Sequence, residues 1–142
     1  MPYLPTYRAA VNATDCDHLG HMNVSRYFAA CSDAMFAIQT ALGLGRSAVA
    51  GERALSFAVV HAESDFRAEL LAGDVMEMET GILSLGTKSA LFHHRLIRVE
   101  DGTLAFESEF RSVCLNLKTR RAEPIPDDIR AAAAAYMVEK PA

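Results

Sequence analysis

Hydrophobic and polar positions along the chain follow two rhythms, one typical of a helix and one typical of strands. From Val24 or Ser25 to Leu42, large apolar residues recur every three or four positions, with alanines in the gaps. This spacing predicts one long amphipathic helix. Asn23 or Ser25 can cap its start, and glycines after Leu42 can end it. Because alanines cover so much of its circumference, we expect other elements to enclose this helix closely.

Short apolar runs with strand-like alternation lie on both sides of the helix. Turn-like residues separate the later runs, and such short separators cannot hold the crossovers that parallel strands need. We therefore expect an antiparallel meander, into which the first strand could insert. The predicted strands are Tyr7–Ala13, Ala54–Ala68, Asp74–Leu85, Ser89–Glu100 and Leu104–Asn116.

A short C-terminal helix completes the predicted elements. Pro126, Asp127 and Asp128 suit its first turn, and we expect it to extend to about Lys140. No internal repeat, linker or second domain stands out in the sequence. The pattern thus predicts an α+β fold in which a long central helix faces a curved antiparallel five-stranded sheet, in a single domain over residues 1–142.

Composition and charge narrow the class of protein. Hydrophobic residues make up 51% of the chain and charged residues 23%, which excludes a disordered chain, and no apolar stretch reaches membrane-spanning length. The start of the chain does not resemble a secretory signal, and three widely spaced cysteines suit a reducing compartment, so we expect a cytoplasmic protein with no membrane contact. With a net charge of −4 and dispersed basic residues, nucleic acid is not an expected partner.

The strongest chemical signal lies in the ten residues Thr14–Asn23, immediately before the helix. They contain two aspartates, two histidines and a glycine. A carboxylate held near a helix N-terminus is suited to catalysis, because the unpaired amides there stabilise negative charge. All possible metal ligands of this segment lie on one tight turn without a second ligand pair, so we expect no metal and no cofactor.

The order of strand, D-x-D-x-x-G-H-x-N turn, long helix and four antiparallel strands resembles the hot-dog fold, in particular the 4-hydroxybenzoyl-CoA thioesterase-like acyl-CoA thioesterases. Gly73-Asp74, Gly86 with Lys88, and Pro124-Ile125-Pro126 are similar to further landmarks of that family. The resemblance covers nearly the whole chain. It implies a homodimer, in some members a homotetramer built as a dimer of dimers, whose joined sheets bind acyl-CoA at the interface between protomers.

The resemblance also assigns the reactive groups. It places the catalytic carboxylate three residues before the turn glycine, on Asp17, and the backbone amide that polarises the thioester carbonyl on or beside Val24. Thioester hydrolysis needs a nucleophile or general base and a donor for the oxyanion, and these two positions supply both. Asp17 could attack the carbonyl or activate water. It could instead only cap the helix or the turn.

Other residues of the turn have weaker assignments. His21 and Asn23 could hold Asp17 through hydrogen bonds or contact the thioester, although His21 could equally be a structural histidine. Gly20 allows a positive φ or close approach of the substrate. Members that act on aromatic acyl groups often carry hydrophobic or aromatic residues where this chain has His21-Met22-Asn23. The resemblance therefore supports the reaction more strongly than the substrate.

Candidate substrate-binding residues lie farther along the chain. Alternation places His61 and Glu63 on one face of a strand that, in this fold, reaches the partner's acyl pocket. Lys88, Arg120 and Arg121 could bind the phosphates of CoA. Each of these residues could instead belong to a solvated surface or a dimer interface.

Taken together, the sequence predicts hydrolysis of an acyl-CoA thioester to the free acid and CoA. One alternative is a hot-dog hydratase or dehydratase, which would need a carboxylate and histidine pair for proton transfer. Another is a protein that binds acyl thioesters without catalysis. The acyl group, the choice between CoA and a carrier-protein thioester, and the chemical route are left open at this point.

Overall fold

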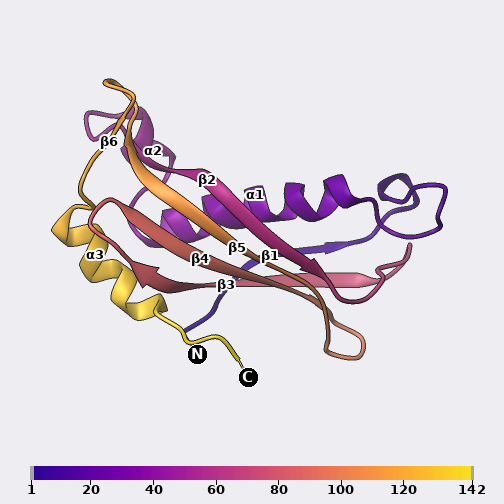
Figure 1. Cartoon of the computed structure of the whole chain (residues 1–142). Helices are drawn as coiled ribbons and strands as arrows, with labels where there is room; N and C mark the ends of the chain where they lie inside the picture. Colours follow the sequence, from indigo (N-terminus) through magenta and orange to yellow (C-terminus); the bar gives the residue numbers. More distant parts are fainter. Residues whose placement is uncertain (1, 142) are drawn as a thin grey trace.

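One long helix lies across the hollow side of a strongly curved antiparallel sheet in the computed structural model, which describes residues 2–141 (Figure 1). This confirms the predicted hot-dog architecture. None of the helices in residues 2–141 is long and apolar enough to cross a membrane. In chain order the elements are β1 (Leu4–Ala10), a 3₁₀ turn (Ala13–Asp15), α1 (Val24–Ala41), α2 (Arg46–Ala50), β2 (Leu55–Phe66), β3 (Val75–Leu85), β4 (Ser89–Arg98), β5 (Thr103–Asn116), β6 (Arg121–Ala122), α3 (Asp127–Ala133) and a second 3₁₀ turn (Ala134–Tyr136).

The strand order differs from a simple meander. The strands lie in the order β1-β3-β4-β5-β2, all antiparallel, and the two-residue β6 pairs beside β5. Only β3, β4 and β5 follow one another as predicted. The expectations that β2 would pair with β3 and that β1 could insert are wrong, because β2 and β1 form the two opposite edges.

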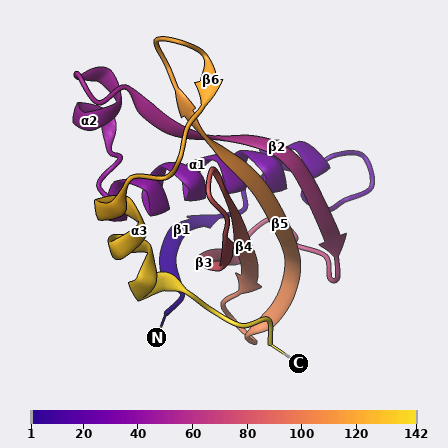
Figure 2. The same ribbon diagram turned by 60° about the vertical axis from the view of Figure 1, so that its left-hand side comes forward.

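The sheet is curled, and this explains why β2 can pair with β5 instead of with β3, the next strand in the sequence (Figure 2). Residues 67–74 connect β2 to β3 across the end of the curved sheet. In this connection Leu70 is fully buried, and its carbonyl accepts a hydrogen bond from the N–H of Met22 at 2.8 Å. The connection therefore closes one end of the core and brings β2 near the loop that precedes α1.

Close packing fixes α1 on the sheet. Ala30 and Ala34 are almost fully buried and Ile38 is completely buried, so small side chains allow close approach and larger ones fill the core. The helix packs mainly on β1 and β3, where Met76 and Met78 face it from the core. Burial of each large apolar side chain contributes about 2 kcal/mol. The position of the helix N-terminus relative to the sheet is thereby set.

The C-terminal helix ends earlier than predicted. Pro126 is its N-cap residue, as expected, but regular helix stops at Ala133 and the 3₁₀ turn at Tyr136. Beyond it, the N–H of Val138 donates to the carbonyl of Ile82 on β3 at 2.9 Å. A Cβ at Gly81 would meet Val138 at 2.6 Å, so the glycine is what lets this segment lie against the strand. The prediction that the helix extends to about Lys140 is wrong because this contact draws the chain out of the helix.

A chain of polar side chains is buried under α1. The hydroxyl of Thr80 lies 2.9 Å from that of Thr6 and 2.8 Å from Nδ1 of His94, and the hydroxyl of Thr6 donates to the carbonyl of Met78 at 3.2 Å. Each hydroxyl has one proton, so Thr80 donates to Thr6 and the N–H at Nδ1 of His94 donates to Thr80. Nε2 of His94 is left as a buried acceptor without a partner in residues 2–141. Burial, together with the neighbouring His93, lowers the pKa of His94 to about 3.

This buried histidine makes stability depend on pH. Because the pKa of His94 is lowered from 6.5 to about 3 in the folded state, the unfolded chain binds a proton that the folded chain does not. The stabilisation from a neutral His94 is complete above pH 6.5 and falls by about 1.4 kcal/mol per pH unit as the pH drops towards 3. We expect wild type to lose about 2 kcal/mol more than His94→Leu between pH 7 and pH 5 in urea unfolding. Equal slopes for wild type and His94→Leu would contradict the assignment.

Candidate functional site

The residues before α1 form a tight loop that reverses the chain. The N–H of Asp17 donates to the carbonyl of His21 at 3.2 Å, and the N–H of Gly20 donates to the carbonyl of Asp17 at 3.0 Å. Cys16 and Met22 form a backbone bridge at the base of the loop. Gly20 has a φ of +84°, a conformation that side-chain-bearing residues rarely adopt. The loop therefore holds Asp17 in a defined place next to the helix start.

Two hydrogen bonds hold the carboxylate of Asp17. The backbone N–H of Leu19 donates to Oδ1 at 2.9 Å, and Nδ2 of Asn23 donates to Oδ2 at 3.0 Å. These donors, with that of Leu19 the stronger influence, keep the pKa of the Asp17 carboxyl below its usual value. The side chain is half-buried. At neutral pH it is a partly exposed, oriented anion.

The start of α1 leaves one backbone donor unpaired. The side-chain oxygen of Asn23 caps the helix by accepting from the N–H of Ser25 at 3.0 Å, and the N–H of Arg26 donates to the carbonyl of Asn23 at 2.9 Å. In the described residues no acceptor pairs with the N–H of Val24. Val24 is 52% exposed. The free donor and the positive end of the helix dipole thus meet at this residue.

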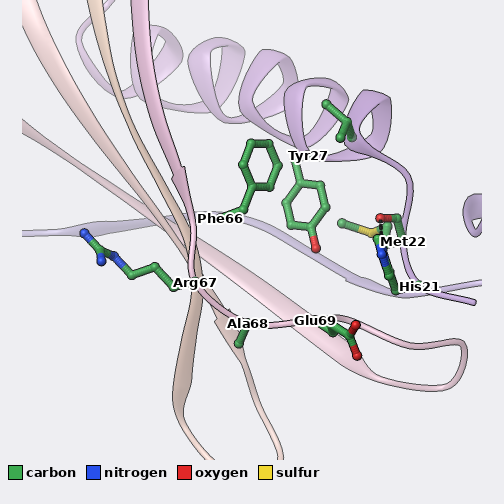
Figure 3. Close-up of a pocket in the computed structure, with 8 residues that line it drawn as sticks. His21, Met22, Tyr27, Phe66, Arg67, Ala68 and Glu69 are labelled. Atoms are coloured by element: carbon green, nitrogen blue, oxygen red, sulfur yellow. Dashed lines mark hydrogen bonds between the residues drawn. The ribbon is translucent and has the colours of Figure 1, made fainter. Parts of the chain in front are cut away.

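A hollow of about 340 Å³ lies beside this donor, between the start of α1 and the end of β2 (Figure 3). In Figure 3 the phenol of Tyr27 points down from α1 into the hollow, His21 lies to the right of this ring, and Glu69 lies below it. Sequence reasoning had no local signal for the part of the wall that follows β2. The lining residues are His21, Met22, Val24, Tyr27, Phe66, Arg67, Ala68 and Glu69.

Asp17 lies next to the hollow but does not line it. Its carboxylate is bonded to Asn23, which directly precedes Val24, and its backbone N–H is bonded to His21, which does line the hollow. The loop and the helix start thus bring together five of the predicted site residues. These are Asp17, Gly20, His21, Asn23 and Val24. Within residues 2–141 no three His, Cys, Asp or Glu side chains are placed to hold a metal ion.

The other predicted residues lie elsewhere. His61 and Glu63 are exposed on the edge strand β2, and Glu63 lines a separate, acidic hollow with residues of β5. Lys88 lies in the β3–β4 hairpin, which contacts α3, and Arg120 and Arg121 lie in the turn before and in β6. In Figure 1 the β3–β4 hairpin and β6 are at the end of the sheet opposite to the loop that precedes α1. Within this chain they lie away from the Asp17 loop.

Comparison with known proteins identifies relatives over most of the chain. The sequence model of the thioesterase-like superfamily matches residues 11–133. Protein THEM6 of Danio rerio is 33% identical over 93 residues, which are 64% of this chain and 44% of that protein. The chain therefore spans less than half the length of the curated relative it matches.

Solved structures are similar over nearly the whole fold. A hypothetical protein from Staphylococcus aureus, solved in complex with CoA, has a TM-score of 0.86 at 24% identity, covering 100% of this chain and 89% of that one. A gentisyl-coenzyme A thioesterase has a TM-score of 0.77 at 27% identity, covering 89% and 98%. A 1,4-dihydroxy-2-naphthoyl-CoA thioesterase from Synechocystis has a TM-score of 0.78 at 21% identity, covering 92% and 95%. The likenesses at 24% and 21% identity support the fold.

The two ends of the Asn23 side chain have separable effects. Asn23→Ala removes both the helix cap and the donor to Asp17, so we expect about 1 kcal/mol less stability and a higher pKa for Asp17. Asn23→Asp keeps a capping oxygen but places a second carboxylate beside Asp17. We expect it to retain most of the stability and to raise the pKa of Asp17 further. NMR titration of the Asp17 carboxyl and thermal unfolding measure the two effects, and an unchanged pKa in both variants would contradict the role of Asn23.

Proposed function

The chain belongs to the thioesterase-like superfamily, and from that membership we propose that it hydrolyses an acyl-CoA thioester to the free acid and CoA, with Asp17 as the catalytic carboxylate. One observation carries the proposal. Val24, whose N–H has no partner within residues 2–141, lines a hollow next to an ionised, oriented Asp17. An oxyanion donor and a carboxylate are the two groups that thioester hydrolysis needs.

The proposed chemistry starts with the thioester carbonyl oxygen against the N–H of Val24. In one route an oxygen of Asp17 bonds to the carbonyl carbon, the carbon–sulfur bond breaks, and CoA leaves as a thiolate. Water then cleaves the mixed anhydride to the free acid and restores the carboxylate. In the other route Asp17 takes a proton from water as the water oxygen bonds to the same carbon. The carbon–sulfur bond then breaks, CoA leaves as a thiolate, and Asp17 returns the proton to the thiolate or to solvent. In both routes the helix start stabilises the oxyanion.

His21 and Asn23 have supporting roles in this proposal. Asn23 positions Asp17 through the 3.0 Å hydrogen bond to Oδ2. Nδ1 of His21 lies 3.2 Å from the carbonyl of Met22, which can only accept, so Nδ1 bears the proton. The other ring nitrogen, Nε2, is then the acceptor of this imidazole, which lines the hollow. It suits a role in orienting water or the thioester.

We propose that the working unit is a homodimer formed through β2. This strand is a sheet edge along its whole length, and Val59 and Val60 on it are 45% and 59% exposed. An open apolar edge pairs readily with another strand. Antiparallel pairing of two β2 strands about a two-fold axis places the end of one protomer against the opposite end of the other. A further pairing of dimers into a tetramer is compatible with this arrangement.

Such a dimer gives the remaining predicted residues a role. The partner's Lys88, Arg120 and Arg121 come towards the reactive loop, where basic groups can bind CoA phosphates. His61 and Glu63 lie on the shared strand and contact the partner. The choice of CoA as the thiol part is supported by the similar proteins, since one was solved with CoA and two are named as thioesterases of aromatic acyl-CoA.

The catalytic carboxylate is tested by Asp17→Asn. We expect at least about 10²-fold lower kcat/KM for acyl-CoA hydrolysis, because the neutral amide neither attacks nor accepts a proton. Since the pKa of Asp17 is below its usual value, its ionisation should cause no loss of kcat/KM in wild type between pH 5 and 8. The matched control is Asp15→Asn. In wild type the carboxylate of Asp15 accepts a hydrogen bond from the N–H of Asn12 and forms an ion pair with Arg26. Thiol release over a panel of acyl-CoAs is the measurement, and unchanged turnover in Asp17→Asn would refute the assignment.

The dimer is tested by a charge on the edge strand. Val60→Lys should convert the protein to monomers and abolish hydrolysis, because an ammonium group would be placed in the contact between the two β2 strands. Val99→Lys makes the same change at an exposed site away from β2 and should leave a dimer. Sedimentation and circular dichroism report assembly and folding. A fully active dimeric Val60→Lys protein contradicts the β2 interface.

A further inference from the structure

The hollow at Val24 is one of three hollows between α1 and β2, which together we call the groove. Two more hollows, of about 290 and 380 Å³, lie along it farther from the Asp17 loop and share Phe36, Gln39 and Ser56 in their walls. Most other lining side chains are apolar, among them Phe57 and Phe110. Gln39 is therefore an amide set in a largely aromatic and aliphatic surface.

The orientation of the Gln39 amide is determined by its neighbours. Oε1 accepts from the N–H of Phe57 at 2.8 Å and from the hydroxyl of Ser56 at 2.9 Å. A backbone N–H can only donate, so the atom facing Phe57 must be the oxygen. Gln39 is only 5% exposed. In residues 2–141 no acceptor pairs with its Nε2, and this atom is not among the fully buried side-chain atoms without a partner. Its two N–H donors therefore reach the hollows that Gln39 lines.

An unpaired donor that a ligand would bury disfavours one class of ligand and favours another. A pure hydrocarbon group in these hollows would leave both N–H groups without water or partner, which is costly. A group with an acceptor oxygen would satisfy one of them. The hydroxyl of Thr40, also in the wall, already donates to the carbonyl of Phe36 at 2.8 Å and does not compete.

We propose that Gln39 determines the acyl specificity of this enzyme, selecting acyl groups with an apolar body and a hydrogen-bond acceptor oxygen at the far end. This inference rests on the proposed thioesterase function. The carbonyl carbon lies at Val24 of one protomer, the apolar body lies between the two protomers, and Nε2 of the partner's Gln39 donates to the distal oxygen.

The acyl group reaches Gln39 of the partner subunit rather than of its own. Along one helix the fifteen residues from Val24 to Gln39 span about 22 Å, too far for a compact acyl group. The two-fold arrangement proposed above runs the two α1 helices in opposite directions, which brings the partner's Gln39 towards Val24. Each acyl site is then completed by both protomers.

The matched substrates for the test are 4-methoxybenzoyl-CoA and 4-ethylbenzoyl-CoA, which have nearly the same shape but differ in one acceptor oxygen. We expect wild type to favour the methoxy compound by at least about fivefold in kcat/KM, the value of one hydrogen bond. Gln39→Glu at pH 8 keeps the acceptor for Phe57 but loses the donors, and Gln39→Met loses both. Both variants should abolish or reverse the preference, while Thr40→Val should keep it. A wild-type ratio near one, or a ratio unchanged in both Gln39 variants, overturns the proposal.

Binding separates this inference from the proposed function. Calorimetry with Asp17→Asn measures the affinity for the two thioesters without turnover. If wild type hydrolyses no acyl-CoA, the proposed function fails, and the affinity ratio in the Asp17→Asn and Asp17→Asn/Gln39→Glu proteins decides on Gln39 by the same criteria.

A mixed dimer tests the placement across the interface. One chain carries Asp17→Asn and the other carries Gln39→Glu. If Gln39 acts across the dimer, the only site with a working Asp17 is completed by the unchanged Gln39 of the partner subunit, and the wild-type preference remains. If Gln39 acts within its own chain, that same site contains the Gln39→Glu substitution and the preference disappears, which would overturn the placement.

Discussion

The close packing of α1 against one half of the sheet is the constraint on which the other features depend. Ala30 and Ala34 have almost no exposed surface, so the helix lies near β1 and β3. On its other side α1 contacts β2 through Tyr27 against Phe66 and through Gln39 against Phe57, and three hollows remain on this side. Because a densely packed core allows little movement, the groove and the helix N-terminus keep a fixed position relative to each other.

The site at the end of this groove results from the way hydrogen bonds are shared at the helix start. Four backbone donors at a helix N-terminus lack partners in the helix itself. The side chain of Asn23 satisfies that of Ser25 and, with its other end, holds Asp17. Among the described residues, 2–141, nothing accepts from the N–H of Val24. The carboxylate of Asp17 stays in place next to the unpaired N–H of Val24 because the side-chain amide of Asn23, which caps the helix, donates a hydrogen bond to it.

Two buried polar side chains on the helix-facing side show how differently an unsatisfied atom can act. Nε2 of His94 is enclosed in the core, so its cost appears as a lowered pKa and a dependence of stability on pH. Nε2 of Gln39 belongs to a side chain that lines two hollows, so a ligand can satisfy it. A polar atom that faces a cavity can therefore be paired by a ligand. An unpaired polar atom enclosed in the core instead changes the stability of the fold.

Local sequence determined much of this protein. The three- and four-residue rhythm determined α1, the alternating runs determined the long strands, and the segment from Asp17 to Val24 could be identified as one site because its members lie within eight positions of one another. Tertiary structure alone decided that β2 pairs with β5, that Val138 ends the C-terminal helix by bonding to β3, and that Phe66 joins Val24 around one hollow. Hydrophobic periodicity records which face of an element is buried, but not which distant element covers it, and those contacts join residues forty or more positions apart.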